Sequence, residues 1–179
     1  ATGPGSVSIL GNSQANRITG NAAANILRGG DGDDTIDGGG GTDQLYGDDG
    51  NDRLIYTSTV TKYDGGAGMD TLDAGNWLGN GVNAIDLTNA AKFAGIETVI
   101  GTQNNDIITG TAAAETIQAG AGNDTIVYSG GTDVIDGGAG FDYIYAGSQT
   151  VKLTVDMADY DNVEGFWGGT NNDSITGTN

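Results

Sequence analysis

Cysteine and histidine are both absent from the 179-residue sequence, and proline occurs once. Without cysteine there is no disulfide framework and no thiolate zinc site, and without histidine there is no Ser-His-Asp triad. Only 6 basic residues stand against 24 acidic ones, and the net charge of −18 excludes a nucleic-acid-binding surface. No apolar run reaches the ~18 residues of a transmembrane helix, so we expect no membrane span.

Glycine and aspartate are what the sequence has in excess. It contains 34 glycines, and 21 of its 24 acidic residues are aspartate rather than glutamate. These two residue types favour turns and oxygen-rich cation sites, whereas helical acidic proteins favour glutamate. At 36 % hydrophobic residues the chain is close to the composition of disordered proteins, which makes disorder the alternative interpretation. The periodicity of the sequence argues against disorder.

A nine-residue repeat covers most of the chain. Residues 29–37 read GGDGDDTID and residues 65–73 read GGAGMDTLD. The first place of a unit is usually Gly, the sixth is usually Asp or Asn, and the eighth is Ile or Leu. The eighth places are Ile18, Leu27, Ile36, Leu45, Leu54, Leu72, Ile108, Ile117, Ile126, Ile135 and Ile144. Residues 56–64 keep the frame but lose the glycines.

The repeats fall into blocks that are separated by two stretches of different composition. We expect a lead-in strand at 1–10, a first block at 11–73, an interruption at 74–100, a second block at 101–145, a second interruption at 146–167 and a truncated third block at 168–179. Each interruption contains an alternating apolar strand and ends in an Ile-Glu or Val-Glu segment. We expect both interruptions to continue the solenoid, and the whole chain to be an excerpt from a longer array.

The unit G-G-x-G-x-D-x-U-x resembles the RTX family, also called haemolysin-type calcium-binding repeats, over roughly two thirds of the chain. The resemblance implies an all-β, right-handed parallel β-roll. Physically, six turn residues and three strand residues make half a coil, and 18 residues return the chain to the same side. The eighth residue then points inward between two parallel sheets. Burying one residue in nine does not offset the conformational entropy that a glycine-rich chain loses when it becomes ordered. A bound cation must therefore contribute to the stability of the fold.

Calcium is the cation that this chemistry favours, because it takes six to eight oxygen ligands from carboxylates and carbonyls. Sixth-place carboxylates that are 18 residues apart lie on the same side of successive coils. Four pairs are fully acidic: Asp34–Asp52, Asp52–Asp70, Asp106–Asp124 and Asp124–Asp142. Three pairs are weaker because one partner is neutral or longer: Asn16–Asp34, Asn25–Asp43 and Glu115–Asp133. The Asp43 row should stop at Thr61, and Asp173 is a further weak candidate.

The family resemblance also implies which backbone carbonyls join each pair of aspartates. One turn contributes the carbonyls of its second and fourth residues, and the turn 18 residues onward contributes those of its first and third. For the four acidic pairs, in order, these are Gly30, Gly32, Gly47 and Asp49; Asp48, Gly50, Gly65 and Ala67; Thr102, Asn104, Ala119 and Ala121; and Gly120, Gly122, Gly137 and Ala139.

The expected function is calcium binding that drives folding outside the cell, where the ion is abundant. The resemblance implies a structural, non-enzymatic part of a larger protein at the bacterial surface or outside the cell, exported by type I secretion, such as an adhesin or S-layer-like component. Its partners would be calcium and the flanking domains. The alternative is a non-catalytic module of a secreted protease, lipase or polysaccharide-modifying enzyme.

The interruptions carry the residues that point to other functions. Trp77, Phe166 and Trp167 offer flat rings for stacking on sugars, so contact with a cell-surface polysaccharide is a further alternative. Glu97 and Glu164 are a pair of acids of the kind that cleaves glycosides. They occupy equivalent places 67 residues apart, which in a solenoid separates them by many strands. We therefore do not expect catalysis.

Overall fold

The computed structural model describes residues 5–79, 83–147, 154–156, 160–169 and 174–176. These residues form strands and turns and contain no helix, so none of them forms a helix that could cross a membrane. The chain divides into two compact units. Unit 1 contains the described residues up to Trp77 together with Asn89–Val99, and unit 2 contains those of Leu78–Thr88 and the chain from Ile100 onward.

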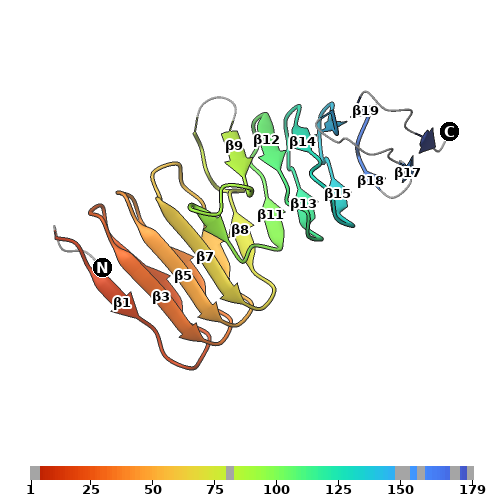
Figure 1. The fold of residues 1–179 in the computed structure, drawn as a ribbon. Helices are drawn as coiled ribbons and strands as arrows, with labels where there is room; N and C mark the ends of the chain where they lie inside the picture. Colours follow the sequence, from red (N-terminus) through yellow and green to blue (C-terminus); the bar gives the residue numbers. More distant parts are fainter. Residues whose placement is uncertain (1–4, 80–82, 148–153, 157–159, 170–173, 177–179) are drawn as a thin grey trace. The chain divides into compact units, whose positions relative to one another are not determined.

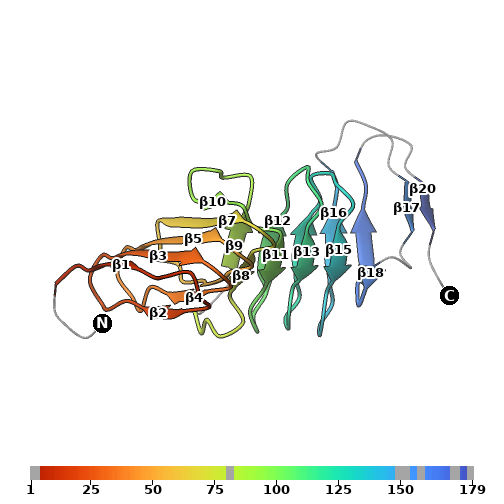
Figure 2. The same cartoon turned by 90° about the horizontal axis from the view of Figure 1, so that it is seen from below.

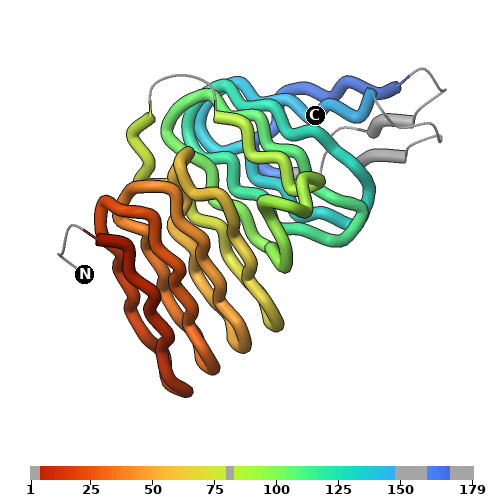
Figure 3. Tube along the Cα trace, turned by 60° about the vertical axis from the view of Figure 1, so that its left-hand side comes forward, coloured from red at the N-terminus to blue at the C-terminus, as the bar shows by residue number. Residues whose placement is uncertain are grey.

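Unit 1 consists of two parallel sheets whose strands alternate along the chain (Figures 1 and 2). One sheet has the order β1-β3-β5-β7-β10, with bounds Ser8–Leu10, Ile26–Asp31, Gln44–Asp49, Lys62–Ala67 and Phe93–Ala94. The other contains β2, β4, β6, β8 and β11, with bounds Arg17–Thr19, Thr35–Asp37, Arg53–Ile55, Thr71–Asp73 and Thr98–Ile100. The chain therefore passes from one sheet to the other every half coil, and Figure 3 shows the resulting flattened coils.

Unit 2 repeats this arrangement. One sheet has the order β9-β12-β14-β16-β19, with bounds Asn83–Asp86, Asp106–Thr109, Thr125–Val127, Tyr143–Tyr145 and Gly165–Trp167. Facing strands are β13, β15 and β18, with bounds Thr116–Gln118, Val134–Asp136 and Tyr160–Asp161. A further parallel pair joins β17 (Thr154–Asp156) to β20 (Ser174–Thr176).

The strand register confirms the 18-residue coil. Ile18 pairs with Ile36 and Ile36 with Leu54 across parallel strands, and Ile108 pairs with Ile126 in the same way. All the eighth-place residues named above are buried, at 6 % exposure or less. Because side chains alternate across a strand, burial of the eighth residue turns the seventh and ninth outward. The fold is the predicted all-β parallel β-roll.

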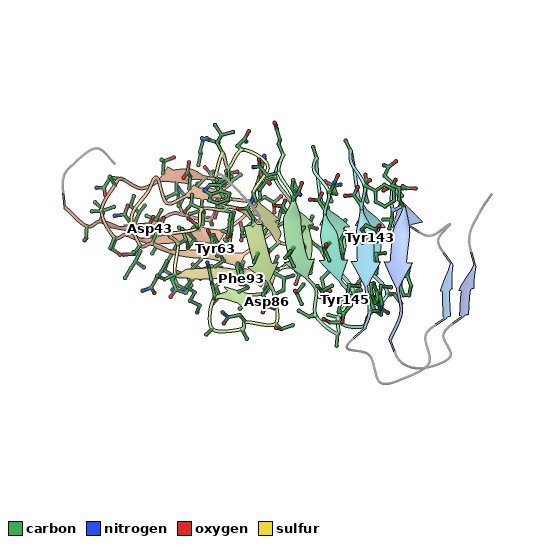
Figure 4. The ribbon with its side chains drawn as sticks, turned by 90° about the horizontal axis from the view of Figure 1, so that it is seen from above. Asp43, Tyr63, Asp86, Phe93, Tyr143 and Tyr145 are labelled. Atoms are coloured by element: carbon green, nitrogen blue, oxygen red, sulfur yellow. The ribbon has the colours of Figure 1, made fainter. Side chains whose placement is uncertain are left out.

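Tyr63 supplies the core residue of the glycine-poor stretch 56–64. It occupies the eighth place of that stretch, pairs with Leu45 and Phe93, and is fully buried. Its ring stacks on Phe93 at a centroid distance of 5.5 Å, and both side chains are labelled in Figure 4. Its hydroxyl donates to the carbonyl of Thr57 at 2.8 Å and accepts from the Thr57 amide at 2.7 Å. The solenoid therefore continues through the stretch without glycine.

The interruptions add strands to the sheets. Residues 83–86 pair with β12 and residues 93–94 pair with β7, so the interruption at 74–100 is shared between the two units. In the interruption at 146–167, residues 160–161 pair with β15 and residues 165–167 with β16. The expected third block is described only at 168–169 and 174–176, and Asp173 lies outside the described residues.

Candidate metal sites

The sixth-place side chains of unit 1 form a hydrogen-bonded row. The backbone N–H of each residue donates to Oδ1 of the aspartate one coil further on: Asn16 to Asp34 at 2.6 Å, Asp34 to Asp52 at 2.7 Å, and Asp52 to Asp70 at 2.8 Å. The 18-residue repeat therefore brings the predicted partners together. It also fixes the orientation of each carboxylate through one of its two oxygens.

Unit 2 contains a matching row. The N–H of Asp106 donates to Asp124 Oδ1, and that of Asp124 to Asp142 Oδ1, both at 2.7 Å. On the opposite side of the coils, Asn25 donates to Asp43 Oδ1 at 2.8 Å in unit 1, and Glu115 to Asp133 Oδ1 at 3.0 Å in unit 2. Thr61 lies one coil after Asp43, and its N–H and Oγ1 both donate to the carbonyl oxygen of Asp43. Because threonine has no carboxylate, the row of carboxylates ends at Asp43.

The second oxygen of six of these aspartates has no hydrogen-bond partner. The atoms are Oδ2 of Asp34, Asp43, Asp52, Asp70, Asp124 and Asp142. All six side chains are at most 2 % exposed. A buried carboxylate oxygen without a partner carries a large desolvation cost. Each of these atoms is therefore a position at which a cation would supply the missing partner.

The six aspartates share one turn conformation, which we call the open turn. In each open turn the second and fourth residues have positive φ, as in Gly30 at 107° and Gly32 at 97° before Asp34. Asp48, at φ 75°, is the one second residue among the six that is not glycine. The open turns are 29–34, 38–43, 47–52, 65–70, 119–124 and 137–142.

Four other turns, which we call closed turns, satisfy the sixth side chain internally. In them the N–H of the second residue donates to the side chain of the sixth: Asn12 to Asn16 at 2.8 Å, Asn21 to Asn25 at 2.7 Å, Thr102 to Asp106 at 2.6 Å and Thr111 to Glu115 at 3.0 Å. None of their second or fourth residues has positive φ. The closed turns are 11–16, 20–25, 101–106 and 110–115, and two of them begin each block.

The side chain of the second residue of a closed turn also accepts a hydrogen bond within the turn. The oxygen of Asn12, Asn21, Thr102 or Thr111 accepts the N–H of the residue two places on, at 2.9–3.0 Å. At Asp106 the remaining oxygen accepts from Thr102 Oγ1 at 3.0 Å and from Asn83 Nδ2 at 2.9 Å. Asp106 is therefore already satisfied by protein donors, unlike its partner Asp124.

Burial changes the pKa values of the aspartates in these rows. Desolvation, with smaller contributions from neighbouring aspartates, raises the pKa of Asp52 and of Asp124 to about 6. Desolvation likewise raises the pKa of Asp43, Asp70 and Asp142. The pKa of Asp133 is raised to about 6, mainly by desolvation and also by Glu115. A bound divalent cation would oppose these shifts, because it stabilises the charged form.

Some of the carbonyls that the family resemblance implies as ligands accept hydrogen bonds from the turn one coil away. Asp49 and Ala67 accept the N–H of Gly32 and Gly50 at 2.7 and 2.9 Å, and Ala139 accepts that of Gly122 at 2.8 Å. The strand register pairs Gly30 with Asp48 and Asp48 with Gly66. Each carbonyl oxygen retains a second lone pair that a metal can use.

The donor set suits calcium. Among the described residues, no three acidic side chains lie close enough together to hold one metal ion, so backbone oxygens would have to complete any site built on an aspartate pair. Oxygen-only ligation that mixes carboxylates and carbonyls is characteristic of Ca²⁺, whereas zinc prefers the Cys and His that this chain lacks.

Sequence reasoning did not place Glu97 and Glu164 in these rows. Glu97 Oε2 accepts the N–H of Asp70 at 2.8 Å, and Glu164 Oε2 accepts that of Asp142 at 2.7 Å. They lie 27 and 22 residues after those aspartates, outside the 18-residue period. The signal that could have found them is the Ile-Glu or Val-Glu segment that ends each interruption.

The family model for the RTX calcium-binding nonapeptide repeat matches the chain in four copies, at residues 19–54, 93–126 and 127–150. These ranges together cover more than half of the chain. No curated protein matches the sequence significantly.

Proposed function

Because the chain belongs to the RTX calcium-binding nonapeptide repeat family, we propose that it is a structural module whose open turns bind several Ca²⁺ ions and which folds when they bind. The observation that carries this proposal is the set of buried Oδ2 atoms without partners. They occur in the open turns, where the repeat places its aspartates in pairs.

Electrostatics supports coupling between calcium binding and folding. Without a cation, the folded chain must bury several unpaired carboxylate oxygens and confine a net charge of −18. With calcium, the binding free energy becomes folding free energy, because the paired turns do not exist in the unfolded chain. The protein is therefore unfolded where calcium is scarce and folded where it is abundant.

The sites are the pairs in which both aspartates have a free oxygen. These are Asp34–Asp52, Asp52–Asp70 and Asp124–Asp142. Asp106–Asp124 is a weaker site because Thr102 and Asn83 occupy the oxygens of Asp106. Asn25–Asp43 and Glu115–Asp133 each join one closed turn to a second turn, and we assign no ion to either pair, because the closed turn already bonds its own sixth side chain. Calcium, when bound, contributes charge neutralisation and cross-links successive coils.

The biological setting follows from the calcium requirement. Extracellular calcium modules bind at about 10⁻⁴–10⁻³ M, far above cytosolic calcium. A chain that folds only in that range would cross the secretion machinery unfolded and fold outside the bacterium. We assign it to a larger secreted or surface-attached protein, of the adhesin or S-layer kind, in which it has no catalytic role. A non-catalytic module of a secreted enzyme is the alternative, and an attached catalytic domain would distinguish the two.

A calcium titration after exhaustive chelation tests the proposed function. Far-UV circular dichroism and tryptophan fluorescence should report a cooperative transition from coil to β-structure between about 0.1 and 5 mM Ca²⁺, with little response to Mg²⁺. A spectrum that is rich in β-structure in chelator and unchanged by calcium would overturn the proposal.

A pocket in unit 1 favours carbohydrate contact as a second candidate function. It has a volume of about 340 Å³ and is lined by Asp37, Gly39, Gly40, Ile55, Tyr56, Thr57, Asn76 and Trp77. Trp77 is half-buried and lies edge-on to Tyr56 at 5.8 Å. An aromatic ring beside a carboxylate and an amide suits a sugar ring and its hydroxyls. Binding of dextran by the calcium-loaded protein, lost in Trp77→Ala, would support this function, and equal affinity in both would contradict it.

A further inference from the structure

The open-turn row of each unit ends on a glutamate rather than an aspartate. Within a row, the N–H of one aspartate donates to a carboxylate oxygen in the next turn, as Asp52 does to Asp70 at 2.8 Å. At the end of the row in unit 1, Asp70 donates to Glu97 Oε2 at 2.8 Å, and in unit 2, Asp142 donates to Glu164 Oε2 at 2.7 Å. Each glutamate therefore makes the contact that the next repeat's aspartate would make.

The backbone before each glutamate also takes the place of a repeat turn. In the row of unit 1, a Cβ added to Gly47 would come closer than 3.0 Å to the carbonyl oxygen of Gly65, in the next turn. A Cβ added to Gly65 would also come closer than 3.0 Å to the carbonyl oxygen of Gly95, although Gly95 lies in the interruption at 74–100. The Gly95 carbonyl thus lies where the first carbonyl of the next turn would be.

Unit 2 has the same arrangement from a different sequence. A Cβ added to Gly137 would come closer than 3.0 Å to the carbonyl oxygen of Asn162. Gly95 and Asn162 both have left-handed backbone, with φ of 54° and 52°, and each lies two residues before its glutamate. Asn is among the few residues besides glycine that adopt this conformation readily. The same local structure therefore occurs at both of these equivalent places.

Backbone hydrogen bonds hold each segment against the last open turn. The amides of Glu97 and Thr98 both donate to the carbonyl oxygen of Asp70, at 3.1 and 2.9 Å. Those of Glu164 and Gly165 donate to the carbonyl oxygen of Asp142, both at 3.0 Å. We call residues 94–98 and 161–165 the terminal arches. They present a carbonyl and a carboxylate to the turn before them.

The aspartate that faces each terminal arch still has a free oxygen. Asp70 and Asp142 are fully buried, and their Oδ2 atoms have no hydrogen-bond partner, like those inside the rows. We infer that each terminal arch completes one further Ca²⁺ site, with Asp70 and Glu97 as carboxylates in unit 1 and Asp142 and Glu164 in unit 2. The carbonyls of Gly95 and Asn162 supply further oxygen. This inference rests on the proposed calcium binding of the open turns.

The chain contains a matched internal control. Its three glutamates are Glu97, Glu115 and Glu164, and Glu115 lies in a closed turn, where Thr111 donates to both of its oxygens through N–H and Oγ1. The inference assigns a terminal Ca²⁺ ion to Glu97 and to Glu164 but none to Glu115. Glu115 differs from the other two only in its surroundings.

Carboxylate NMR tests the inference on the unaltered chain. With glutamate labelled with ¹³C at Cδ, the protein gives three side-chain carboxylate signals, and Glu115→Gln identifies one of them. When Ca²⁺ is added to protein held folded in sub-saturating calcium, the two other signals should shift further while that of Glu115 does not move. Saturation that leaves all three unmoved would overturn the inference.

Ion counting separates this inference from the proposed function. By equilibrium dialysis with ⁴⁵Ca²⁺, Glu97→Gln and Glu164→Gln should each bind one ion fewer than the parent, with Glu115→Gln unchanged. Gln keeps the length and an oxygen for the Asp70 or Asp142 N–H but removes the charge. If Asp52→Asn loses calcium while both glutamine variants keep the parental count, only the terminal sites are wrong. If the parent binds no calcium, the proposed function itself is wrong.

Discussion

Asp34 and Asp52 lie one coil apart, and the backbone N–H of Asp34 donates a 2.7 Å hydrogen bond to Oδ1 of Asp52. The Oδ2 atoms of both residues are buried and have no partner. Half of each carboxylate therefore organises the polypeptide, and the other half remains available for a ligand. Because one carboxylate has these two roles, we expect its substitution to have opposite effects on stability with and without calcium.

Asp52→Asn tests both roles of the carboxylate, because Asp52 belongs to two of the proposed sites. With calcium, the variant should need at least about tenfold more Ca²⁺ to fold, since even residues that only support a metal ligand are worth about 10–100-fold in affinity. In chelator, the residual structure of the variant should be more stable, because a neutral amide is cheaper to bury than an unpaired carboxylate. Calcium titrations followed by circular dichroism measure both effects.

Asp31→Asn is the control for that variant. Asp31 is an exposed aspartate in the open turn 29–34, one coil before Asp52, so the substitution removes the same charge without altering the row. It should leave the calcium midpoint within about twofold of the parent, because exposed charges contribute little. Equal shifts in the two variants would show that net charge, and not the row, governs calcium binding.

The raised pKa values of the buried aspartates predict how pH affects the calcium-free protein. Burial raises the pKa of Asp52 and Asp124 to about 6 in the folded state, against 3.8 ordinarily. The folded state therefore binds more protons than the unfolded chain between these values, and it gains stability as pH falls through 6. That contribution is fully present below about 3.8 and is lost as pH rises past 6. Calcium affinity should change in the opposite direction, falling as the aspartates protonate.

Far-UV circular dichroism in calcium-depleted buffer at pH 5.0 and pH 7.5 measures this effect through the residual β-structure. The β-structure content should be higher at pH 5.0, and the difference should shrink in the double variant Asp52→Asn, Asp124→Asn, whose amides do not titrate. A higher β-structure content at pH 7.5 in the parent would contradict the prediction.

Positive φ at the second residue of an open turn predicts the cost of a methyl group there. Gly66 has φ of 107°, and a Cβ at this position would come closer than 3.0 Å to the carbonyl oxygen of Asp48. Gly66→Ala should therefore destabilise the calcium-loaded protein by more than about 1–2 kcal/mol. Chemical denaturation in saturating calcium measures the loss. Gly5→Ala, where a Cβ meets no atom within 4 Å, should have no effect.

The closed turns should not acquire calcium through a change of charge alone. In Asn16→Asp, the Asn12 amide would still occupy one oxygen of the new carboxylate, as the Thr102 amide does at Asp106. Equilibrium dialysis should therefore detect no additional ion. In the triple variant Asn12→Gly, Gln14→Gly, Asn16→Asp, the backbone can adopt the open conformation, and the protein should bind one more ion. An extra ion in the single variant would show that turn conformation does not control binding.

The nine-residue period was sufficient to predict the regular part of the fold and of the rows. It places Leu27 and Leu45 in one layer of the core and brings Asp34 to Asp52, because equal spacing along a solenoid becomes adjacency between coils. It also predicted that the Asp43 row stops at Thr61. The period contains no information about which carboxylate oxygens accept hydrogen bonds from donors in their own turn. Asp106 and Asp124 occupy the same place in the repeat, yet only Asp124 has a free oxygen.

The contacts of the two interruptions and of the glycine-poor stretch 56–64 could be identified only from the tertiary structure. Sequence alone determined the β-roll, its inward-facing residues and the spacing of its aspartates, because each depends only on the repeat length. The tertiary structure decided that Tyr63 fills the core where the glycines are missing, and that Glu97 and Glu164 end the rows. These contacts lie outside the 18-residue period. They depend on the path of the interruptions and on the backbone conformation of Gly95 and Asn162, which spacing does not encode.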